Sequence, residues 1–266
     1  GKDWGLMIGG TYSYSTAILK SIGNDVYSAN FVDLYGTGGL GSSDYFFRLY
    51  EGTQIGSLRG FKYAGYTEDG QLLHYTYTED EEGNRILAVD ENGEPITSTK
   101  TGIKDSDKQV IGNTLPEHAF SLNITLKYKN WDLSINGRGL AGHDIWNSQL
   151  QNYGYPGVAA ENLLKSAYEK YPHLTADNNY LNSFFLEKGD WFKIEKVSVG
   201  RNFNFKENKA GFDNMYVYLA ATNLLTLTKF SGVDPSTVSS IGLTPGIAGS
   251  TSLYTTKITL GISAKF

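Results

Sequence analysis

The chain has 266 residues, of which 14% are aromatic and 19% charged, and its formal net charge is −5. This balance is too aromatic and too weakly charged for a disordered chain, and the acidic sign argues against a nucleic-acid-binding protein, whose surface would be basic. The sequence has no cysteine, which excludes disulfide scaffolds and thiol nucleophiles, and no run of roughly 18 apolar residues, so no transmembrane helix is predicted.

Alternation of apolar and polar residues with a period of two is the main pattern along the chain. At 117–129, Phe120, Leu122 and Ile124 share one face, and the residues between them are polar. A helix would spread such apolar residues around its axis, so the pattern predicts strands. Eight segments show it: 4–18, 56–66, 71–78, 117–129, 131–145, 187–204, 212–227 and 253–266. The predicted fold class is all-β, an antiparallel transmembrane β-barrel segment of about eight strands, for which about 9–11 residues per strand suffice.

The connections between these segments alternate in length. The short ones are 67–70, 129–130 and 206–211, and the long ones are 19–55, 79–116, 146–186 and 228–252. Outer-membrane barrels show this asymmetry, because their short turns face the periplasm and their long loops face the outside. A soluble sandwich has no reason to sort its loops in this way. The alternation therefore favours a membrane barrel with long extracellular loops.

Local features refine this prediction. The apolar phase changes within 190–204, which predicts a β-bulge near Glu195-Lys196. Trp4 and Trp131 follow similar short turns and are expected at the membrane interface, where aromatic girdles lie. The apolar residues between Val158 and Lys170 recur at i, i+3 and i+4, which predicts one short helix in a loop.

The sequence predicts no catalytic site. The four histidines lack metal-ligand spacing such as His-Glu-x-x-His, and we expect all of them on strand or loop surfaces: His74, His118, His143 and His173. His143-Asp144 is compatible with a general base and its orienting carboxylate, but no nucleophile motif accompanies the pair. The chain is therefore not expected to be an enzyme.

Two acidic segments carry oxygen ligands of the type that calcium prefers. They are Asp90–Glu94 and Asp105–Asp107, and neither completes an EF-hand loop. We expect solvated turns at both places and no cofactor, with calcium binding in the loops as the alternative.

Two groups of residues are candidates for contact with a ligand. Aromatic rings and amides hold sugars and peptides, and a cluster of both follows a predicted strand. The candidates for ligand or partner contact in this cluster are Trp146, Asn147, Asn152, Tyr153 and Tyr155. On the strand itself, Asp132, Asn136 and Arg138 lie opposite the apolar face, so they would line the polar lumen of a wide barrel.

Several runs of residues resemble one known family. The run 111–116, followed by a strand and a Lys-Asn turn, is similar to the SusC/RagA family of TonB-dependent outer-membrane transporters, and 55–63 resembles it more weakly. The runs 185–194 and 221–235 resemble late strands of that family. Phe266 matches the terminal aromatic residue that the barrel-assembly machinery recognises.

The resemblance implies a fold and a role. Family members have a barrel of about 22 strands with a plug domain and a TonB box, so residues 1–266 are expected to be the C-terminal part of a barrel, with the plug and TonB box absent. The implied function is import of glycans or peptides across the bacterial outer membrane. The implied partners are a SusD-like surface lipoprotein, the TonB complex acting through the missing N-terminal part, and membrane lipid, with no nucleic acid.

Two alternatives remain open for the same residues. The first is a complete eight-stranded barrel that serves as an adhesin or structural protein, and direct pairing of 4–18 with 253–266 would support it. The second is a soluble β-sandwich or carbohydrate-binding module.

Overall fold

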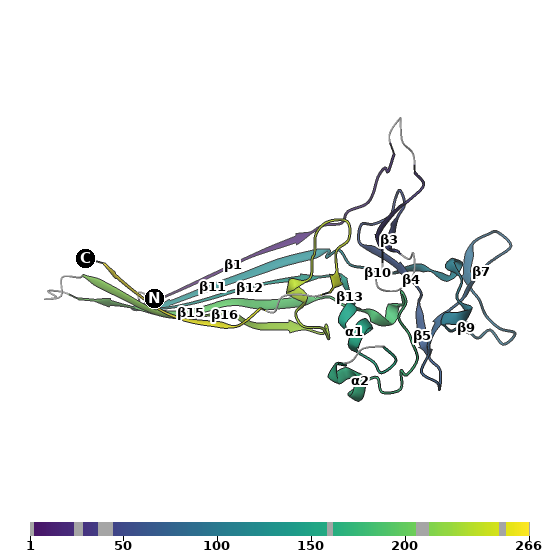
Figure 1. The fold of residues 1–266 in the computed structure, drawn as a ribbon. Helices are drawn as coiled ribbons and strands as arrows, with labels where there is room; N and C mark the ends of the chain where they lie inside the picture. Colours follow the sequence, from purple (N-terminus) through teal and green to yellow (C-terminus); the bar gives the residue numbers. More distant parts are fainter. Residues whose placement is uncertain are drawn as a thin grey trace.

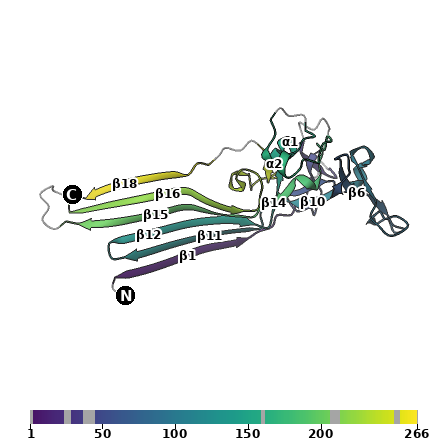
Figure 2. The ribbon, with the colours of Figure 1, turned by 90° about the horizontal axis from the view of Figure 1, so that it is seen from below.

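A long twisted sheet extends from a body of short strands and helices in the computed structural model (Figure 1). The structure describes residues 3–23, 29–36, 45–158, 162–205, 213–249 and 254–265. We call the body at the far end the loop body, because it consists of the three long connections 15–117, 142–190 and 229–256. Both chain ends lie at the opposite end of the sheet (Figure 2).

The long sheet has six antiparallel strands in the order β1-β11-β12-β15-β16-β18. Their bounds are Trp4–Tyr14 (β1), His118–Tyr128 (β11), Trp131–Ala141 (β12), Trp191–Asn204 (β15), Asn214–Thr228 (β16) and Lys257–Lys265 (β18). Each strand pairs with a neighbour that precedes or follows it in this order, so β1 and β18 form opposite edges and do not pair with each other. The class of fold expected from the alternation is confirmed.

The count of eight long strands is wrong in the part of the chain that the structure describes. Segments 56–66 and 71–78 fold as β4 (Ser57–Gly60), β5 (Tyr63–Tyr66) and β6 (Leu72–Tyr75) in the loop body. Leu58, Phe61 and Leu72 are buried in the core of that body. Alternation marks any strand that is covered on one side only, so the pattern does not separate a strand facing lipid from one facing a protein core.

The register sorts the long sheet into one apolar and one polar face. One apolar row crosses all six strands and contains Leu6, Leu126, Leu133, Val199, Leu219 and Leu260. A polar row on the opposite face contains Gly9, Asn123, Asn136, Lys196, Thr222 and Lys257. In the described structure no second layer of protein covers the apolar rows, and most of their leucines are exposed.

The predicted bulge is confirmed. The register between β12 and β15 passes from Asn136↔Lys196 to Gly137↔Ile194, so Glu195 is the extra residue. The shift also affects the β15–β16 pairing, where Asn223 adopts a left-handed conformation with φ of 53°. The inserted residue keeps the apolar side chains on one face although their parity in the sequence changes.

The short turn at Lys129-Asn130 lies at the end of the sheet that carries the chain termini, and the long connections lie at the other end (Figure 2). The turn at 67–70, however, belongs to the loop body. The expected turn at 206–211 lies outside the described residues, as does Phe266. The sorting of short and long connections to opposite ends therefore holds for the strands of the long sheet.

The loop body contains the protein's main hydrophobic core. Its further strands are β2 (Val32–Gly36), β3 (Tyr45–Leu49), β7 (Tyr77–Glu79), β8 (Arg85–Leu87), β9 (Thr97–Ser98), β10 (Gln109–Asn113), β13 (Asp144–Asn147), β14 (Leu186–Lys188) and β17 (Ile247–Ala248). Short 3-10 turns are η1 (Lys100–Gly102), η2 (Asp105–Asp107), η3 (Ser183–Phe185) and η4 (Pro235–Thr237). The largest fully buried side chains of the described chain, such as Trp146, Tyr155, Phe47 and Phe61, all lie in this body.

The helix prediction is partly right. Helix α2 (Lys165–Glu169) lies inside the predicted range Val158–Lys170, whereas residues 159–161 of that range lie outside the described residues. A second helix, α1 (Ser148–Tyr153), was not predicted; the Asn147 side chain caps it by accepting a hydrogen bond from the Leu150 amide. None of the helices in the described residues is long and apolar enough to cross a membrane.

Candidate functional site

The predicted lumen residues lie on the polar face of the long sheet, as their alternation requires. The Tyr216 hydroxyl donates to Asp132 Oδ2 over 2.8 Å, and both residues border a hollow of about 570 Å³ near the chain-terminal end. Farther along β12, Arg138 Nε donates to Glu195 Oε1 over 2.5 Å, and its guanidinium lies 5.3 Å from the Trp191 ring. Together these side chains line the face with a series of charged and aromatic contacts.

A loop folds onto this polar face and is held by a buried lysine. Lys193 Nζ donates to Asp234 Oδ2 over 3.0 Å and to Ser236 Oγ over 2.9 Å, and its side chain is only 3% exposed. Its ammonium also lies 4.4 Å from the centre of the Tyr254 ring. Burial alone would raise the pKa of Asp234, but hydrogen bonds from Ser236 and Lys193 outweigh burial and lower it. The connection 229–256 is therefore anchored to the sheet at β15.

Two of the three aromatic members of the predicted contact cluster, Trp146 and Tyr155, are buried. The Trp146 ring packs edge-on against Phe46 at 5.0 Å, and its Nε1 donates to Gln151 Oε1 over 3.0 Å. Tyr155 is fully buried beside Phe185, and burial raises the pKa of its hydroxyl. Trp146 and Tyr155 therefore shape the core of the loop body and present no surface to a ligand in this structure.

Asn147 joins three elements of the loop body. Its Nδ2 donates to Glu187 Oε1 over 2.8 Å and to Ser231 Oγ over 3.1 Å. Glu187 also accepts hydrogen bonds from the hydroxyl and the amide of Ser231, each over 2.7 Å. Of the remaining candidates, Asn152 and Tyr153 are exposed. Direct contact by these two residues stays a prediction.

A hollow of about 220 Å³ adjoins this junction between α1, α2 and the connection after β16. Its lining includes Asn147, which is one of the predicted contact candidates, and Gln149, Lys170, Tyr171 and Ser231, which are not. Ser231 lies in the run 221–235, which carries part of the family resemblance. Nothing in the local sequence around Lys170 or Tyr171 predicts that these two residues line a hollow. The hollow is thus lined by residues that carry amide, hydroxyl and ammonium groups.

The histidines divide into two pairs, and the expectation that all four lie on surfaces is wrong for two of them. His74 and His143 are buried, and burial lowers the pKa of each. The His118 Nδ1 and the Tyr12 hydroxyl share a hydrogen bond of 2.9 Å. The His173 ring lies tilted by 34° against the Tyr66 ring, with the ring centres 4.1 Å apart. The described residues contain no group of three or more His, Asp or Glu side chains arranged to hold a metal ion.

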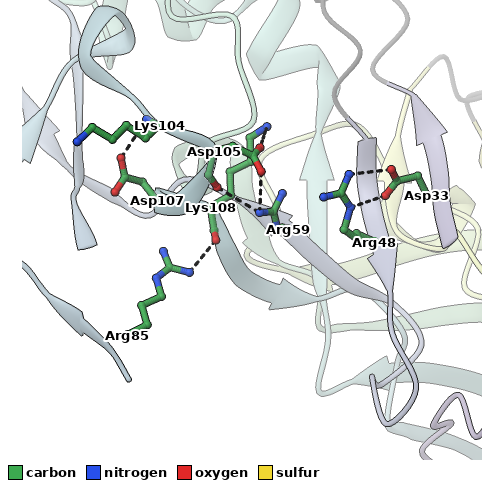
Figure 3. A network of polar contacts seen from close by, with 8 residues as sticks. All are labelled: Asp33, Arg48, Arg59, Arg85, Lys104, Asp105, Asp107 and Lys108. Carbon is green, nitrogen blue, oxygen red and sulfur yellow. Dashed lines mark hydrogen bonds and ion pairs between the residues drawn. The ribbon is translucent and has the colours of Figure 1, made fainter. Parts of the chain in front are cut away.

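One of the two acidic segments is part of a polar network in the loop body (Figure 3). Asp105 pairs with Arg59 at 3.3 Å and with Lys108 at 3.0 Å. Asp107 is buried and accepts hydrogen bonds from the Lys104 and Tyr77 amides, whereas a separate bidentate pair joins Asp33 to Arg48. The Arg59–Asp105 pair connects β4 with the segment before β10, and the Asp107 contact with Tyr77 connects that segment with β7.

The other acidic segment forms a self-contained turn. Asp90 Oδ1 accepts hydrogen bonds from the Asn92 and Glu94 amides over 2.8 and 2.9 Å, and these bonds lower the pKa of Asp90. The segment is therefore an exposed turn, as expected. Calcium binding in these loops stays a prediction.

Comparison with known proteins shows what this chain is similar to. No family model matches the chain. Two TonB-dependent receptors of Formosa agariphila are 29% and 26% identical to it over 83% and 70% of its length, and the TonB-dependent receptor SusC of Bacteroides thetaiotaomicron is 24% identical over 66%. A RagAB peptide transporter structure covers the whole chain with a TM-score of 0.76 at 18% identity. The resemblance to the SusC/RagA family is confirmed.

The match extends over part of each relative. The chain spans about a fifth of the length of the curated relatives, at 19%, 23% and 18%, and 28% of the chain in the RagAB structure. A second RagAB structure, in an open-open state, covers the whole chain with a TM-score of 0.68. That the chain is the C-terminal part of a barrel stays a prediction. The bacterial outer membrane is the location of the family. The relatives are named as receptors and transporters, which is consistent with a protein that is not an enzyme.

Proposed function

We propose that this chain forms part of the wall and outer mouth of a TonB-dependent transporter that imports a glycan or peptide across the outer membrane. The observation that carries the proposal is the long sheet, whose rows are apolar on one face and polar on the other across all six strands. In a bilayer the apolar face contacts lipid and the polar face lines the lumen. Asp132, Asn136 and Arg138 are then lumen residues.

The unpaired edges of the sheet support a wall that further strands complete. β1 and β18 lie at opposite edges, so the pairing that would support a closed small barrel is absent from the described residues. Unpaired strand edges are unfavourable in lipid, because their backbone groups find no water. A β-sandwich is likewise not supported, since in the described chain no second sheet packs on the apolar rows. We therefore place the sheet between other strands of a large barrel.

The loop body is suited to contact a partner above the barrel. It lies at the end of the sheet away from the chain termini and has its own hydrophobic core, so it presents a preformed surface (Figure 1). We propose that this surface meets a SusD-like lipoprotein that delivers the substrate, with energy supplied by the TonB complex. Asn152 and Tyr153 are the exposed members of the predicted contact cluster.

An uptake assay on the full-length receptor tests the proposal. Cells that lack the receptor should lose uptake of one class of labelled substrate, either oligosaccharides or oligopeptides, and the wild-type gene should restore it. Arg138→Gln should reduce uptake severalfold, whereas Lys165→Gln on the exposed face of α2 serves as the matched control. Unchanged uptake of both classes after deletion of the receptor would contradict the proposal.

A further inference from the structure

The hollow of about 220 Å³ beside α1 and α2, which we call the junction hollow, has walls that hydrogen bonds hold in place. The buried Asn147 donates to Glu187 over 2.8 Å and to Ser231 over 3.1 Å. The Leu164 amide donates to the Tyr153 carbonyl over 2.8 Å, which ties the start of α2 to the end of α1. A ligand that enters such a preformed site pays little to order it.

Three polar side chains in the lining have hydrogen-bond donors left for a ligand. Those of Gln149, Lys170 and Tyr171 make no hydrogen bond or ion pair with other residues that the structure describes, and Lys170 is exposed. Burial raises the pKa of the Tyr171 hydroxyl, so it stays protonated and able to donate. Both oxygens of Glu187 already accept hydrogen bonds, and this residue is not among those that line the hollow. A cation and neutral donors without a carboxylate favour an anionic group on the ligand.

The apolar part of the lining is mainly aliphatic. Leu150, Leu164 and Val233 contribute to it, and the last two are 41% and 49% exposed. Tyr171 is the one aromatic residue among the described lining residues, and its ring packs against Phe184 with the ring centres 5.2 Å apart. Sugar rings stack on open aromatic faces, whereas aliphatic side chains bury apolar surface against one another. The lining therefore suits an aliphatic amino-acid side chain better than a sugar.

The size and the position of the junction hollow fit the end of a longer ligand. Pockets that enclose a whole small molecule measure about 300–1,000 Å³, so this smaller hollow holds only the end of an oligomer. Its wall continues to the polar face of the long sheet, because Val233 precedes Asp234, which is bound to Lys193 of β15. In the orientation given under Proposed function, the hollow therefore lies beside the outer end of the lumen.

We propose that the junction hollow binds the carboxy-terminal residue of an oligopeptide substrate. The terminal carboxylate meets the Lys170 ammonium, and Gln149 and Tyr171 supply further donors. The side chain of the last residue packs against Leu164 and Val233. Since every oligopeptide ends in a carboxylate, such a site accepts peptides of many sequences. The inference rests on the proposed function and deepens it, because it selects peptides over glycans as the class of substrate.

Fluorescence anisotropy of the purified full-length receptor tests this proposal with two probes. One is a pentapeptide that ends in leucine, labelled at its amino terminus and carrying a free carboxylate, and the other is the same peptide with a terminal amide. The free acid should bind about tenfold more tightly than the amide, which is the effect of one charge-assisted hydrogen bond. Lys170→Gln should remove this preference by weakening the binding of the free acid alone. Lys165→Gln is the matched control and should keep the preference, because Lys165 lies at the other end of α2, pairs with Glu169 and does not line the hollow.

A further variant tests the hollow itself. Val233→Trp should fill it from its exposed side and weaken the binding of both probes. Equal affinity of the wild type for acid and amide, an unchanged preference in Lys170→Gln, or unchanged affinities in Val233→Trp would overturn the proposal. Tighter binding of an oligogalacturonate than of the peptide acid, lost in Lys170→Gln, would assign the hollow to an acidic glycan and overturn it as well. Substrate uptake by cells is scored separately: equal affinities with normal uptake contradict this inference alone, and acid preference without any uptake contradicts the transport function alone.

Discussion

Removal of the Lys193 ammonium tests how the connection 229–256 is attached to the sheet. Lys193→Met keeps most of the side-chain volume but deletes the hydrogen bonds to Asp234 and Ser236. Asp234 is then left without its cation in a site where its side chain is only 14% exposed. Breaking a buried ion pair by removing one partner costs about 3–5 kcal/mol, more than either hydrogen bond alone, because the remaining charge is poorly solvated.

Amide hydrogen exchange on the full-length receptor measures this cost locally. The Ser236 amide donates to Asp234 Oδ1 and the Val238 amide to the Pro235 carbonyl, so both are protected only while the loop is folded onto the sheet. A loss of about 3 kcal/mol should raise their exchange rates by roughly a hundredfold, since each 1.4 kcal/mol corresponds to a factor of ten. Exchange in the distant hairpin β7–β8 is the internal control.

A second variant separates charge from packing. Lys193→Met combined with Asp234→Asn removes both charges. The double substitution should therefore lower the stability of the loop attachment clearly less than the sum of the two single substitutions does. The pKa of Asp234 in the folded protein lies below its usual 3.8. The contribution of the Asp234 carboxylate to the stability of the loop attachment is therefore complete above pH 3.8 and is lost as the pH falls further. Additive single costs, or unchanged exchange at Ser236 in Lys193→Met, would refute the anchoring role.

Three further outcomes are expected. The buried neutral His74 has a pKa below 6.5, so the loop body should lose stability as the pH falls below that value, and His74→Phe should flatten this dependence in thermal melts between pH 7 and 4. Glu187→Ala should destabilise the junction of α1 with the connection after β16 by about 2–3 kcal/mol, and faster hydrogen exchange of the Ser231 amide would show this loss. Unchanged exchange would show that Asn147 alone is enough to hold the junction. Gly139→Leu should prevent assembly, because its Cβ would lie 2.4 Å from the Trp191 carbonyl oxygen; heat-modifiable mobility of the receptor on gels would show whether the barrel still forms.

Alternation in the sequence predicted the long sheet because lipid imposes the same demand on every strand. The ends of β11, the start of β12 and the bulge at Glu195 follow directly from the parity of apolar residues, whereas β12 ends at Ala141 and not at the predicted residue 145. The segments 56–66 and 71–78 satisfied the same pattern for a different reason, since Leu58 and Leu72 turn toward a protein core. A local pattern records that one face is covered but not what covers it.

The candidate site was less accessible to sequence reasoning. The cluster around Trp146 and Asn147 does lie at the outer end of the sheet, but the burial of Trp146 depends on Phe46, which is distant in the sequence. The binding of Lys193 to Asp234 joins two segments whose likeness to one family was visible, yet no spacing rule predicts their pairing. The short polar helix α1 has a capping asparagine as its one local signal.

The apolar face of the long sheet tolerates more amino-acid substitutions than the loop body does. A side chain such as Leu126, Leu219 or Leu260 meets fluid acyl chains. Any residue of similar hydrophobicity can therefore replace it, because no fixed neighbour constrains the shape of its side chain. A side chain in the loop body, such as Trp146, meets fixed neighbours and has far fewer acceptable replacements. The RagAB structure has a TM-score of 0.76 to this chain at only 18% identity, which agrees with this tolerance of substitutions. Homology between receptors of this kind should therefore persist longest in the packed outer body and fade first on the surface that touches lipid.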